Sequence, residues 1–416
     1  MYDIIRHELR RRKRPVGVAI VGLGFMGYGL LRQLQSMDGF RVQLLVSRNL
    51  DRTQARLRQA GVPFVITDTA ASAAQGDHGD LLRVTDDYRS ISQASCDIVV
   101  EMSGDVPYAT IVTLHSLDAG LNVATMNAEL HATVGHRLRR IADDAGLVVA
   151  DVQGDQPGSL AAFMEEVRFF GFNPVMAGNI KGFLDHHATP ESLIEEGQKR
   201  GLSGKQVTSF TDGTKIALEM ALVANHYGMT LLAPGMHGHT VESLDEILNV
   251  FDWSRVPEQG CVDYVIGRGL PAGIFAVGTH SDAGQASYLQ YLKLGDGPLY
   301  MLYRPFHLCH LEAPYSIARM VLYGKGTIHS AAQPTTAVVA IAKRDLLPGD
   351  VLDGIGGYCC YGEIRTVADP ETPAAVPIGL AEGATVKRAI TKDELIAFAD
   401  VTLPVNRAVE LFYENR

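Results

Sequence analysis

The chain has 416 residues, a formal net charge of −10, and a composition that is 46% hydrophobic and 20% charged. These values are those of an ordinary globular protein of roughly two to three domains. The acidic balance argues against a nucleic-acid partner, and no apolar run approaches the roughly 20 residues that span a membrane. The five cysteines are irregularly spaced, which indicates reduced thiols, and the N-terminus lacks the apolar core of a signal peptide, so we expect a cytoplasmic protein.

The first fourteen residues are basic, and Ile4, Ile5 and Leu9 recur there at roughly helical spacing. Such a segment could bind anions, but a helix that packs on the domain or on another subunit is the simpler interpretation. From Val16 onward, short apolar strands alternate with helical stretches, which is typical of a parallel sheet with helices on both faces. The predicted strands are Val16–Val21, Arg41–Val46, Asp97–Glu101, Leu121–Thr125 and Gly146–Asp151, and the predicted helices are Phe25–Met37, Val106–Ala119 and Val134–Ala145. The polar run Ala70–Leu82 is expected to be a surface excursion.

Changes in this pattern predict three domains. Residues 1–152 are expected to form a Rossmann-type, doubly wound α/β domain that binds a dinucleotide. Residues 153–330 lose the strand alternation and carry polar signatures, which favours an α+β substrate domain whose end could pack back on the first domain. Residues 331–416 contain short strands, a Pro348–Gly349 turn and no long helix, which predicts a small β-rich module.

The clearest functional motif is Gly22-Leu23-Gly24-Phe25-Met26-Gly27, which follows a predicted strand and opens a predicted helix. Gly22 would allow the tight turn, Gly24 would let the backbone approach a pyrophosphate, and Gly27 would let the helix pack on the strand. The free N–H groups of the helix N-terminus favour phosphate. The motif therefore predicts a dinucleotide site that includes Phe25 and Met26, and a glycine-rich turn without a nucleotide is the alternative.

The end of the second strand indicates which cofactor is bound. It reads Val46-Ser47-Arg48-Asn49, with no acid to accept the ribose hydroxyls of NAD. Arg48, next to Ser47 and assisted by Arg52, suits a 2′-phosphate, so we expect NADP(H). The alternative is that Arg48 is an ordinary surface residue.

The ends of the next two strands contribute further candidates, because ligands bind at the carboxyl edge of such sheets. Ser103 and Gly104 follow one strand, and Asn127 follows the other. Glu129 could be an acid of the site or, equally, a first-turn acid of the next helix.

Several runs resemble known oxidoreductases. DIVVE-x-SG, GLNVATMN and DGTK resemble the homoserine dehydrogenase group. A closer resemblance is to the deoxyxylulose-phosphate reductoisomerase-like family, which joins such a core to a C-terminal SAF domain. The matching runs are GDQPG (Gly154–Gly158), GNIKG (Gly178–Gly182), TSFTDGTK (Thr208–Lys215), VAN (Val223–Asn225), YRPFHLCHLEAPYSIAR (Tyr303–Arg319) and AKRDLLPGDVLDGIGGY (Ala342–Tyr358). The resemblance implies NADPH-dependent conversion of deoxyxylulose 5-phosphate to methylerythritol 4-phosphate, a step of isoprenoid precursor synthesis.

One position departs from the first of these groups. Homoserine dehydrogenases typically carry Lys after the Asn that ends the fifth strand, whereas Ala128 follows Asn127 here. Asp212 and Lys215 still resemble the acid and the lysine of that group's substrate site.

Reduction of a carbonyl needs a group that polarises its oxygen, and an ammonium with a lowered pKa can do so. Lys215 and Lys181 are the candidates, with an exposed or simply ion-paired lysine as the alternative for each. Asp155 and Asp212 could orient a lysine, bind substrate hydroxyls or hold a cation, and a turn-forming role is the alternative.

The expected substrate set is larger. Gln156, Asn179 and His307 lie in family-matching runs, and a phosphate could be bound by Lys181, Ser209, Lys215 and Arg304. A skeletal rearrangement often uses Mg²⁺ or Mn²⁺, for which Asp155, Glu129 and Glu219 are candidate ligands. The histidine pairs lack the spacing of a zinc site, and Cys359-Cys360 is expected to be buried.

Three functions remain open at this point. The first is an NADPH-dependent oxidoreductase of a small polyhydroxylated, phosphorylated carbonyl compound, with the reductoisomerase as its most specific form. The second is a homoserine dehydrogenase-like, sugar-acid or polyol dehydrogenase without rearrangement. The third is a nucleotide-binding regulatory protein without turnover. A homodimer or higher homo-oligomer is the expected assembly, with no nucleic-acid or membrane partner.

Overall fold

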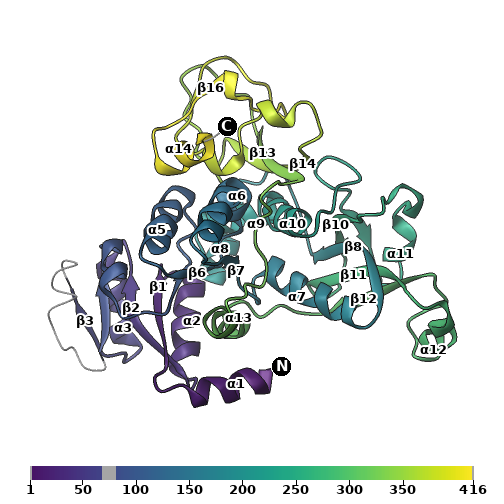
Figure 1. Ribbon diagram of the computed structural model, residues 1–416. Helices are drawn as coiled ribbons and strands as arrows, with labels where there is room; N and C mark the ends of the chain where they lie inside the picture. The colour runs from purple at the N-terminus through teal and green to yellow at the C-terminus, as the bar shows by residue number, and fades with distance from the viewer. Residues whose placement is uncertain (1, 68–80, 415–416) are drawn as a thin grey trace. The chain divides into compact units, whose positions relative to one another are not determined.

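The computed structural model describes residues 2–67 and 81–414 (Figure 1). Most of the predicted excursion Ala70–Leu82 lies outside these residues, but Leu82 itself begins a strand that the sequence did not predict. The chain divides into two compact units. Unit 1 comprises residues 1–130, 137–155 and 308–329, and unit 2 comprises residues 131–136, 156–307 and 330–416.

Unit 1 is built on a seven-stranded sheet in the order β3-β4-β2-β1-β5-β6-β7. Its strands are β1 (Val16–Val21), β2 (Phe40–Val46), β3 (Phe64–Ile66), β4 (Leu82–Thr85), β5 (Ile98–Glu101), β6 (Asn122–Thr125) and β7 (Val149–Asp151). Every neighbouring pair is parallel. The strand order runs outward in both directions from β1, so the predicted doubly wound Rossmann-type fold is confirmed.

Helices cover both faces of this sheet. They are α1 (Tyr2–Arg11), α2 (Phe25–Gln35), α3 (Leu50–Gln59), η1 (Tyr88–Gln93), α5 (Val106–Asp118), α6 (Ala128–Asp144) and α13 (Cys309–Tyr323). Alternate residues of β1 enter different cores: Val18 and Ile20 pack with α2 and α13, whereas Ala19 and Val21 pack with α5. Figure 1 shows α13 beside α2, although the two are far apart in sequence.

The basic N-terminal segment follows the simpler of its two interpretations. It forms α1, and Ile5 and Leu9 are buried in the core shared by α2 and α13. Its arginines remain outside this core, and Arg14 pairs with Asp97 at 2.6 Å.

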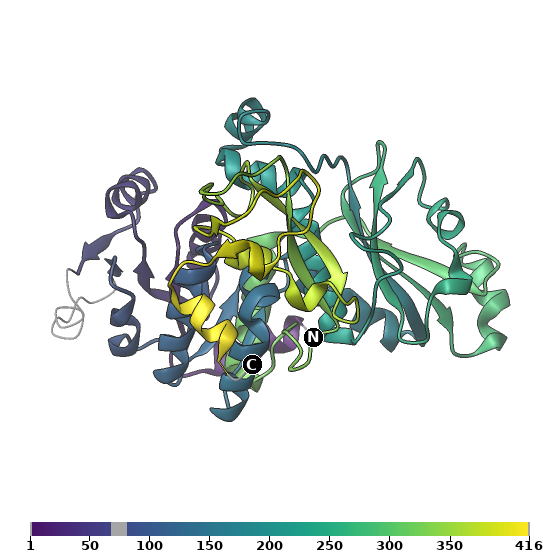
Figure 2. The same ribbon diagram turned by 90° about the horizontal axis from the view of Figure 1, so that it is seen from above.

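Unit 2 contains a five-stranded mixed sheet in the order β12-β11-β8-β10-β9, coloured teal to green in Figure 2. The strands are β8 (Phe172–Lys181), β9 (His239–Val241), β10 (Cys261–Gly267), β11 (Gly273–His280) and β12 (Leu299–Arg304). The helices are α7 (Gln156–Phe169), α8 (Ile194–Arg200), α9 (Gly204–Thr211), α10 (Thr214–Tyr227), α11 (Ile247–Val250), η2 (Trp253–Arg255), η3 (Ala283–Gln285) and α12 (Ala286–Tyr291). The expected α+β character of this region is confirmed.

Residues 331–416, the C-terminal segment, are also part of unit 2 and are rich in short strands, as expected. The segment contains two antiparallel strand pairs and several isolated bridges. The elements are β13 (Thr336–Ala342), β14 (Cys360–Thr366), η4 (Thr372–Ala374), η5 (Ile378–Leu380), β15 (Thr385–Val386), η6 (Phe398–Asp400), β16 (Val401–Thr402) and α14 (Arg407–Tyr413). β13 and β14 pack against α10.

One predicted boundary is wrong for a clear reason. α6 begins at Ala128 rather than at Val134, because the Asn127 side chain caps it by accepting the Leu130 N–H at 3.0 Å. Across the described ranges, no helix is both long enough and apolar enough to cross a bilayer.

Candidate dinucleotide and substrate site

In the glycine loop between β1 and α2, the protein's own atoms require glycine at two of the three positions. Gly22 has φ +94°, and a Cβ there would lie 2.9 Å from the Met102 carbonyl oxygen. A Cβ at Gly27 would collide with the Gly22 carbonyl oxygen. At Gly24, the N-cap of α2, a Cβ would meet no protein atom within 4 Å. The protein itself therefore does not require glycine at position 24, whereas a closely approaching pyrophosphate would, and the loop fits such a ligand. Phe25 and Met26 form the first turn of α2, as expected.

An arginine that the sequence did not single out supports this loop. Arg56 of α3 donates from Nη1 to the carbonyl oxygens of Leu23 and Gly24, each at 3.2 Å. Its guanidinium also lies 4.5 Å from the centre of the Tyr28 ring. These contacts fix the loop and place a positive charge beside it.

The predicted 2′-phosphate residues lie at the end of β2. Arg48 is half exposed, pairs with Asp105 at 2.6 Å and stacks 4.5 Å from the Tyr108 ring centre. Burial raises the pKa of Tyr108 to about 12, so its ring stays neutral beside the cation. Ser47 is buried and its Oγ is 2.7 Å from Thr53 Oγ1. Arg48 is thus held in place, and a bound phosphate would compete with Asp105 for it.

The ends of β5 and β6 are joined by a carboxylate that the sequence reasoning missed. Glu101 is fully buried; its Oε1 accepts the Ser103 N–H at 2.7 Å and its Oε2 accepts from Asn127 Nδ2 at 2.8 Å. Burial raises the pKa of Glu101, and these hydrogen bonds oppose the shift. The predicted residues Ser103 and Asn127 are therefore brought together, with Gly104 at φ +67° beside them. An acid that ends an otherwise apolar strand was the available signal.

The turn that carries Asp155 is locked onto the start of α13 within unit 1. Gly154 has φ +104°, and a Cβ there would collide with the Cys309 carbonyl oxygen. The preceding residue, Gln153, donates from Nε2 to Glu312 Oε2 at 3.0 Å. Asp155 Oδ2 is buried and has no hydrogen-bond partner among the described residues. This oxygen is available to a substrate hydroxyl or a cation.

The two candidate lysines of unit 2 lie on elements that meet at one carboxylate. Lys181 ends β8, and its Nζ is 3.5 Å from Glu219 Oε2 of α10. Lys215 lies in the first turn of α10, one turn before Glu219 and on the same helix face. Asn179, on the same strand as Lys181, is buried. Glu219 is thus placed to position a lysine. The sequence analysis had named it only as a candidate metal ligand.

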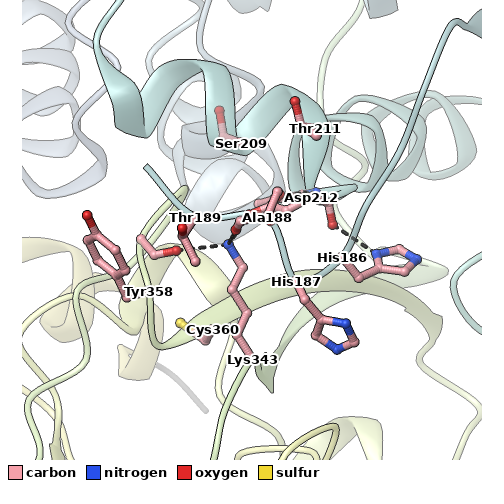
Figure 3. A network of polar contacts seen from close by, with 12 residues as sticks. His186, His187, Ala188, Thr189, Ser209, Thr211, Asp212, Lys343, Tyr358 and Cys360 are labelled. Atoms are coloured by element: carbon pink, nitrogen blue, oxygen red, sulfur yellow. Dashed lines mark hydrogen bonds and ion pairs between the residues drawn. The ribbon is translucent and has the colours of Figure 1, made fainter. Parts of the chain in front are cut away.

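Asp212 is bound by a lysine that the sequence reasoning did not single out. Its Oδ2 accepts from Nζ of Lys343 at 2.7 Å, and both side chains are buried (Figure 3). Its Oδ1 accepts the Thr214 N–H at 2.9 Å. Because both carboxylate oxygens are engaged, this geometry favours a structural role for Asp212. Neighbouring Ser209 donates its hydroxyl to the Gln206 carbonyl oxygen at 2.8 Å within α9.

The remaining predicted substrate residues all lie in unit 2. Gln156 begins α7 and is buried, with Nε2 3.6 Å from Met220 Sδ and Oε1 unpartnered among the described residues. Arg304 ends β12 and lies 5.1 Å from the Phe306 ring centre, and His307 follows it in the chain.

A cavity of about 230 Å³ also lies in unit 2, between α6 residues and the C-terminal segment. His131, Asn225, Thr336 and Phe412 are among its lining residues, which include no Asp, Glu, Lys or Arg. This uncharged lining does not suit a phosphorylated substrate.

The structure gives no geometric support for the expected Mg²⁺ or Mn²⁺ site. Among residues 2–67 and 81–414, no group of three or more His, Cys, Asp and Glu side chains could hold a metal ion. Glu129 occupies the first turn of α6, which favours its helix-stabilising interpretation. His237 pairs with buried Asp263 at 2.9 Å rather than with other candidate ligands. Cys359 and Cys360 are free and buried, as expected.

Comparison with known proteins adds a family match. Residues 154–313 match the model described as "Oxidoreductase DRL, catalytic domain". The homoserine dehydrogenase of Mycobacterium tuberculosis is 29% identical over 135 residues, 32% of this chain and 27% of that protein. The Mycobacterium leprae enzyme is 31% identical over 137 residues with the same coverage. The matched region thus spans about a quarter of these curated relatives.

Similar solved structures include a probable dehydrogenase from Thermotoga maritima, with 11% identity, 75% of this chain and 90% of that chain covered, and a TM-score of 0.43. The myo-inositol 2-dehydrogenase from Lactobacillus plantarum is 10% identical, with 75% of this chain and 91% of that chain covered and a TM-score of 0.43. These likenesses support no argument about function. The catalytic-domain match supports the predicted oxidoreductase enzyme.

Proposed function

We propose that this protein is an NADPH-dependent oxidoreductase of a small polyhydroxylated, phosphorylated carbonyl compound. Its most specific form is the reductoisomerase that converts deoxyxylulose 5-phosphate to methylerythritol 4-phosphate, in isoprenoid precursor synthesis. The observation that carries the proposal is the oxidoreductase catalytic-domain match over residues 154–313, which contain Lys181 and Lys215. The C-terminal segment would then be the SAF domain of that family, and the protein a cytoplasmic homodimer.

The choice of NADPH over NADH rests on the end of β2. Residues 46–49 at this strand end include no acid for the ribose hydroxyls, and Arg48 is oriented by Asp105 and Tyr108. A guanidinium in this position recognises a phosphate by charge-assisted hydrogen bonds. Gly22, Gly24 and Gly27 would hold the pyrophosphate, and Glu101 would fix Ser103 and Asn127 near the ends of the strands.

The protein's own residues would supply binding and proton transfer. A bound nicotinamide supplies a hydride to the substrate carbonyl carbon. Lys215 would donate a proton to the carbonyl oxygen, and Lys181, paired with Glu219, would orient the substrate oxygens. Asp155 has a free carboxylate oxygen for a substrate hydroxyl. Arg304 and His307, with Gln156 and Asn179, are the proposed contacts for the rest of the substrate.

The second candidate is a dehydrogenase without skeletal rearrangement. The similarity to homoserine dehydrogenases over 135 residues favours it. The absence of a lysine after Asn127 argues against homoserine as the substrate, so a sugar acid or polyol is the better form of this alternative.

NADPH consumption with deoxyxylulose 5-phosphate tests the proposal, first with Mn²⁺ and then with a chelator. Turnover that gives methylerythritol 4-phosphate supports the reductoisomerase, and its loss with chelator would establish the metal requirement. If NADPH binds but deoxyxylulose 5-phosphate is not consumed, the reductoisomerase is excluded. Parallel assays with homoserine and NADP⁺, and with polyols and sugar acids, then decide the second candidate.

A further inference from the structure

The helix that carries Lys215 is held at its start by the C-terminal segment. Nζ of Lys343, which follows β13, donates to Asp212 Oδ2, to the Ala188 carbonyl oxygen at 2.9 Å and to the Gly357 carbonyl oxygen at 2.8 Å (Figure 3). The three N–H groups of this ammonium are therefore all used. The side chains of Lys343 and Asp212 are 2% and 0% exposed, so water does not replace these contacts.

Asp212 transmits this constraint to α10. Its other oxygen, Oδ1, accepts the N–H of Thr214, the first residue of the helix, at 2.9 Å. The Thr214 hydroxyl in turn accepts the Gly362 N–H of β14 at 2.8 Å. Lys215 follows directly, so the backbone from which it projects is fixed by two contacts that lead to the C-terminal segment.

The far end of α10 is held in the same way. Asn225 Oδ1 accepts the N–H groups of Thr335 and Thr336, at 2.7 and 2.8 Å, and its Nδ2 donates to the Thr336 carbonyl oxygen at 3.1 Å. Both ends of the helix are thus attached to β13 and its flanking residues, while Glu219 lies between them. A helix held at two ends cannot shift along or rotate about its axis without breaking buried hydrogen bonds.

We propose that Lys343 is a positioning residue for Lys215, which acts through Asp212, and that the C-terminal segment is a working part of the active site. Lys343 touches neither substrate nor cofactor in this role. The inference depends on the proposed function only in taking Lys215 as the proton donor. It assigns to the C-terminal segment a function in the same chain, distinct from capping a site or forming a subunit interface.

The test compares Lys343→Met, Asp212→Asn and the double variant with the wild type. Lys392→Met is the matched control, because it removes an exposed lysine of the same segment. We would measure kcat and KM with NADPH and deoxyxylulose 5-phosphate, the NADPH dissociation constant, and hydrogen exchange of residues 212–218. Rates are expressed per NADPH-binding molecule, so that a loss of folded protein does not count as a loss of catalysis.

We expect Lys343→Met to lower kcat about tenfold or more, since small misplacements of a catalytic group cost about that much. The NADPH dissociation constant should stay within about twofold, because the glycine loop belongs to unit 1. The double variant should be no slower than Lys343→Met, because both changes act through one contact. An unchanged kcat per NADPH-binding molecule, or single effects that add in the double variant, would overturn the inference.

Two further outcomes are separable. Lys343→Met leaves the charge of Asp212 buried and unpaired, so this variant can fail to fold. In that case the double variant, which removes both charges, is compared with Asp212→Asn. If the wild type does not turn over deoxyxylulose 5-phosphate, the proposed function fails and hydrogen exchange decides the inference alone. Faster exchange confined to the first turn of α10 supports it, and unchanged exchange there contradicts it.

Discussion

The partners of Arg48 and Glu101, rather than their residue types, determine what each side chain can do. Arg48 is an exposed cation in a position where many related sheets carry an acid, and its partners Asp105 and Tyr108 orient it. Glu101 is a buried acid that accepts hydrogen bonds from the Ser103 N–H and from Asn127 Nδ2. The sequence suggested a role for Arg48, because a strand end is easy to recognise. The role of Glu101 was missed, although an acid that ends an otherwise apolar strand was an available signal.

Arg48→Gln should weaken NADPH binding about tenfold and leave NADH binding nearly unchanged. The physical reason is that a charge-assisted hydrogen bond to a phosphate contributes roughly 1.5–3 kcal/mol, part of which the pairing with Asp105 already offsets. Titration of nicotinamide fluorescence measures both affinities. Arg58→Gln is the control, since that arginine follows ten residues later and contacts Gln54 and the Phe64 ring. Equal losses for NADPH and NADH would show that Arg48 does not read the 2′-phosphate.

Glu101 should make stability depend on pH in a defined direction. Burial raises its folded-state pKa above the unfolded value of about 4.3, so the folded protein binds this proton more tightly than the unfolded chain. The contribution is fully present below the unfolded pKa and is lost as pH rises through the folded pKa. The free energy of unfolding of the wild type, relative to Glu101→Gln, should therefore fall from about pH 4.5 upward. Urea unfolding of both proteins across pH 4–8 measures this, and parallel curves would contradict it.

At the scale of elements, the sequence predicted most of what is local. The strands of unit 1 and the turn before α2 follow from apolar runs and glycine spacing. β3 and β4 were missed because each is short, Phe64–Ile66 and Leu82–Thr85, and β4 follows a polar run. The start of α6 was misplaced because the Asn127 cap outweighs the later apolar pattern. The pairing of Asp212 with Lys343 joins positions that are 131 residues apart, and no local pattern encodes such a contact.

The β1–α2 turn offers a matched pair of substitutions. Gly27→Ala should lower the free energy of unfolding by about 1–3 kcal/mol, because its Cβ would collide with a backbone oxygen that cannot move aside. Gly24→Ala should leave stability almost unchanged, because its Cβ meets no protein atom, and yet weaken NADPH binding at least about tenfold. Thermal unfolding and fluorescence titration separate the two effects. Tight NADPH binding by Gly24→Ala would exclude a pyrophosphate at that position.

For the whole molecule, the chain leaves unit 1 after Asp155 and returns to it at Leu308, so the matched catalytic region is largely an insertion into unit 1. The C-terminal segment joins unit 2, where it packs on α10. The sequence predicted this succession of α/β, α+β and β-rich regions, whereas the substrate depends on side chains whose joint arrangement a linear pattern does not specify. The proposed reaction is therefore the claim that experiment must test first.

The most direct test of that claim is the transfer of label from NADPH that carries deuterium at the reactive position of its nicotinamide. The enzyme would be incubated with this cofactor and deoxyxylulose 5-phosphate, and the product analysed by mass spectrometry. The proposed reaction yields methylerythritol 4-phosphate with one deuterium per molecule. A labelled alcohol with an unrearranged skeleton would favour the plain dehydrogenase, and the absence of any labelled product would contradict the proposed reaction.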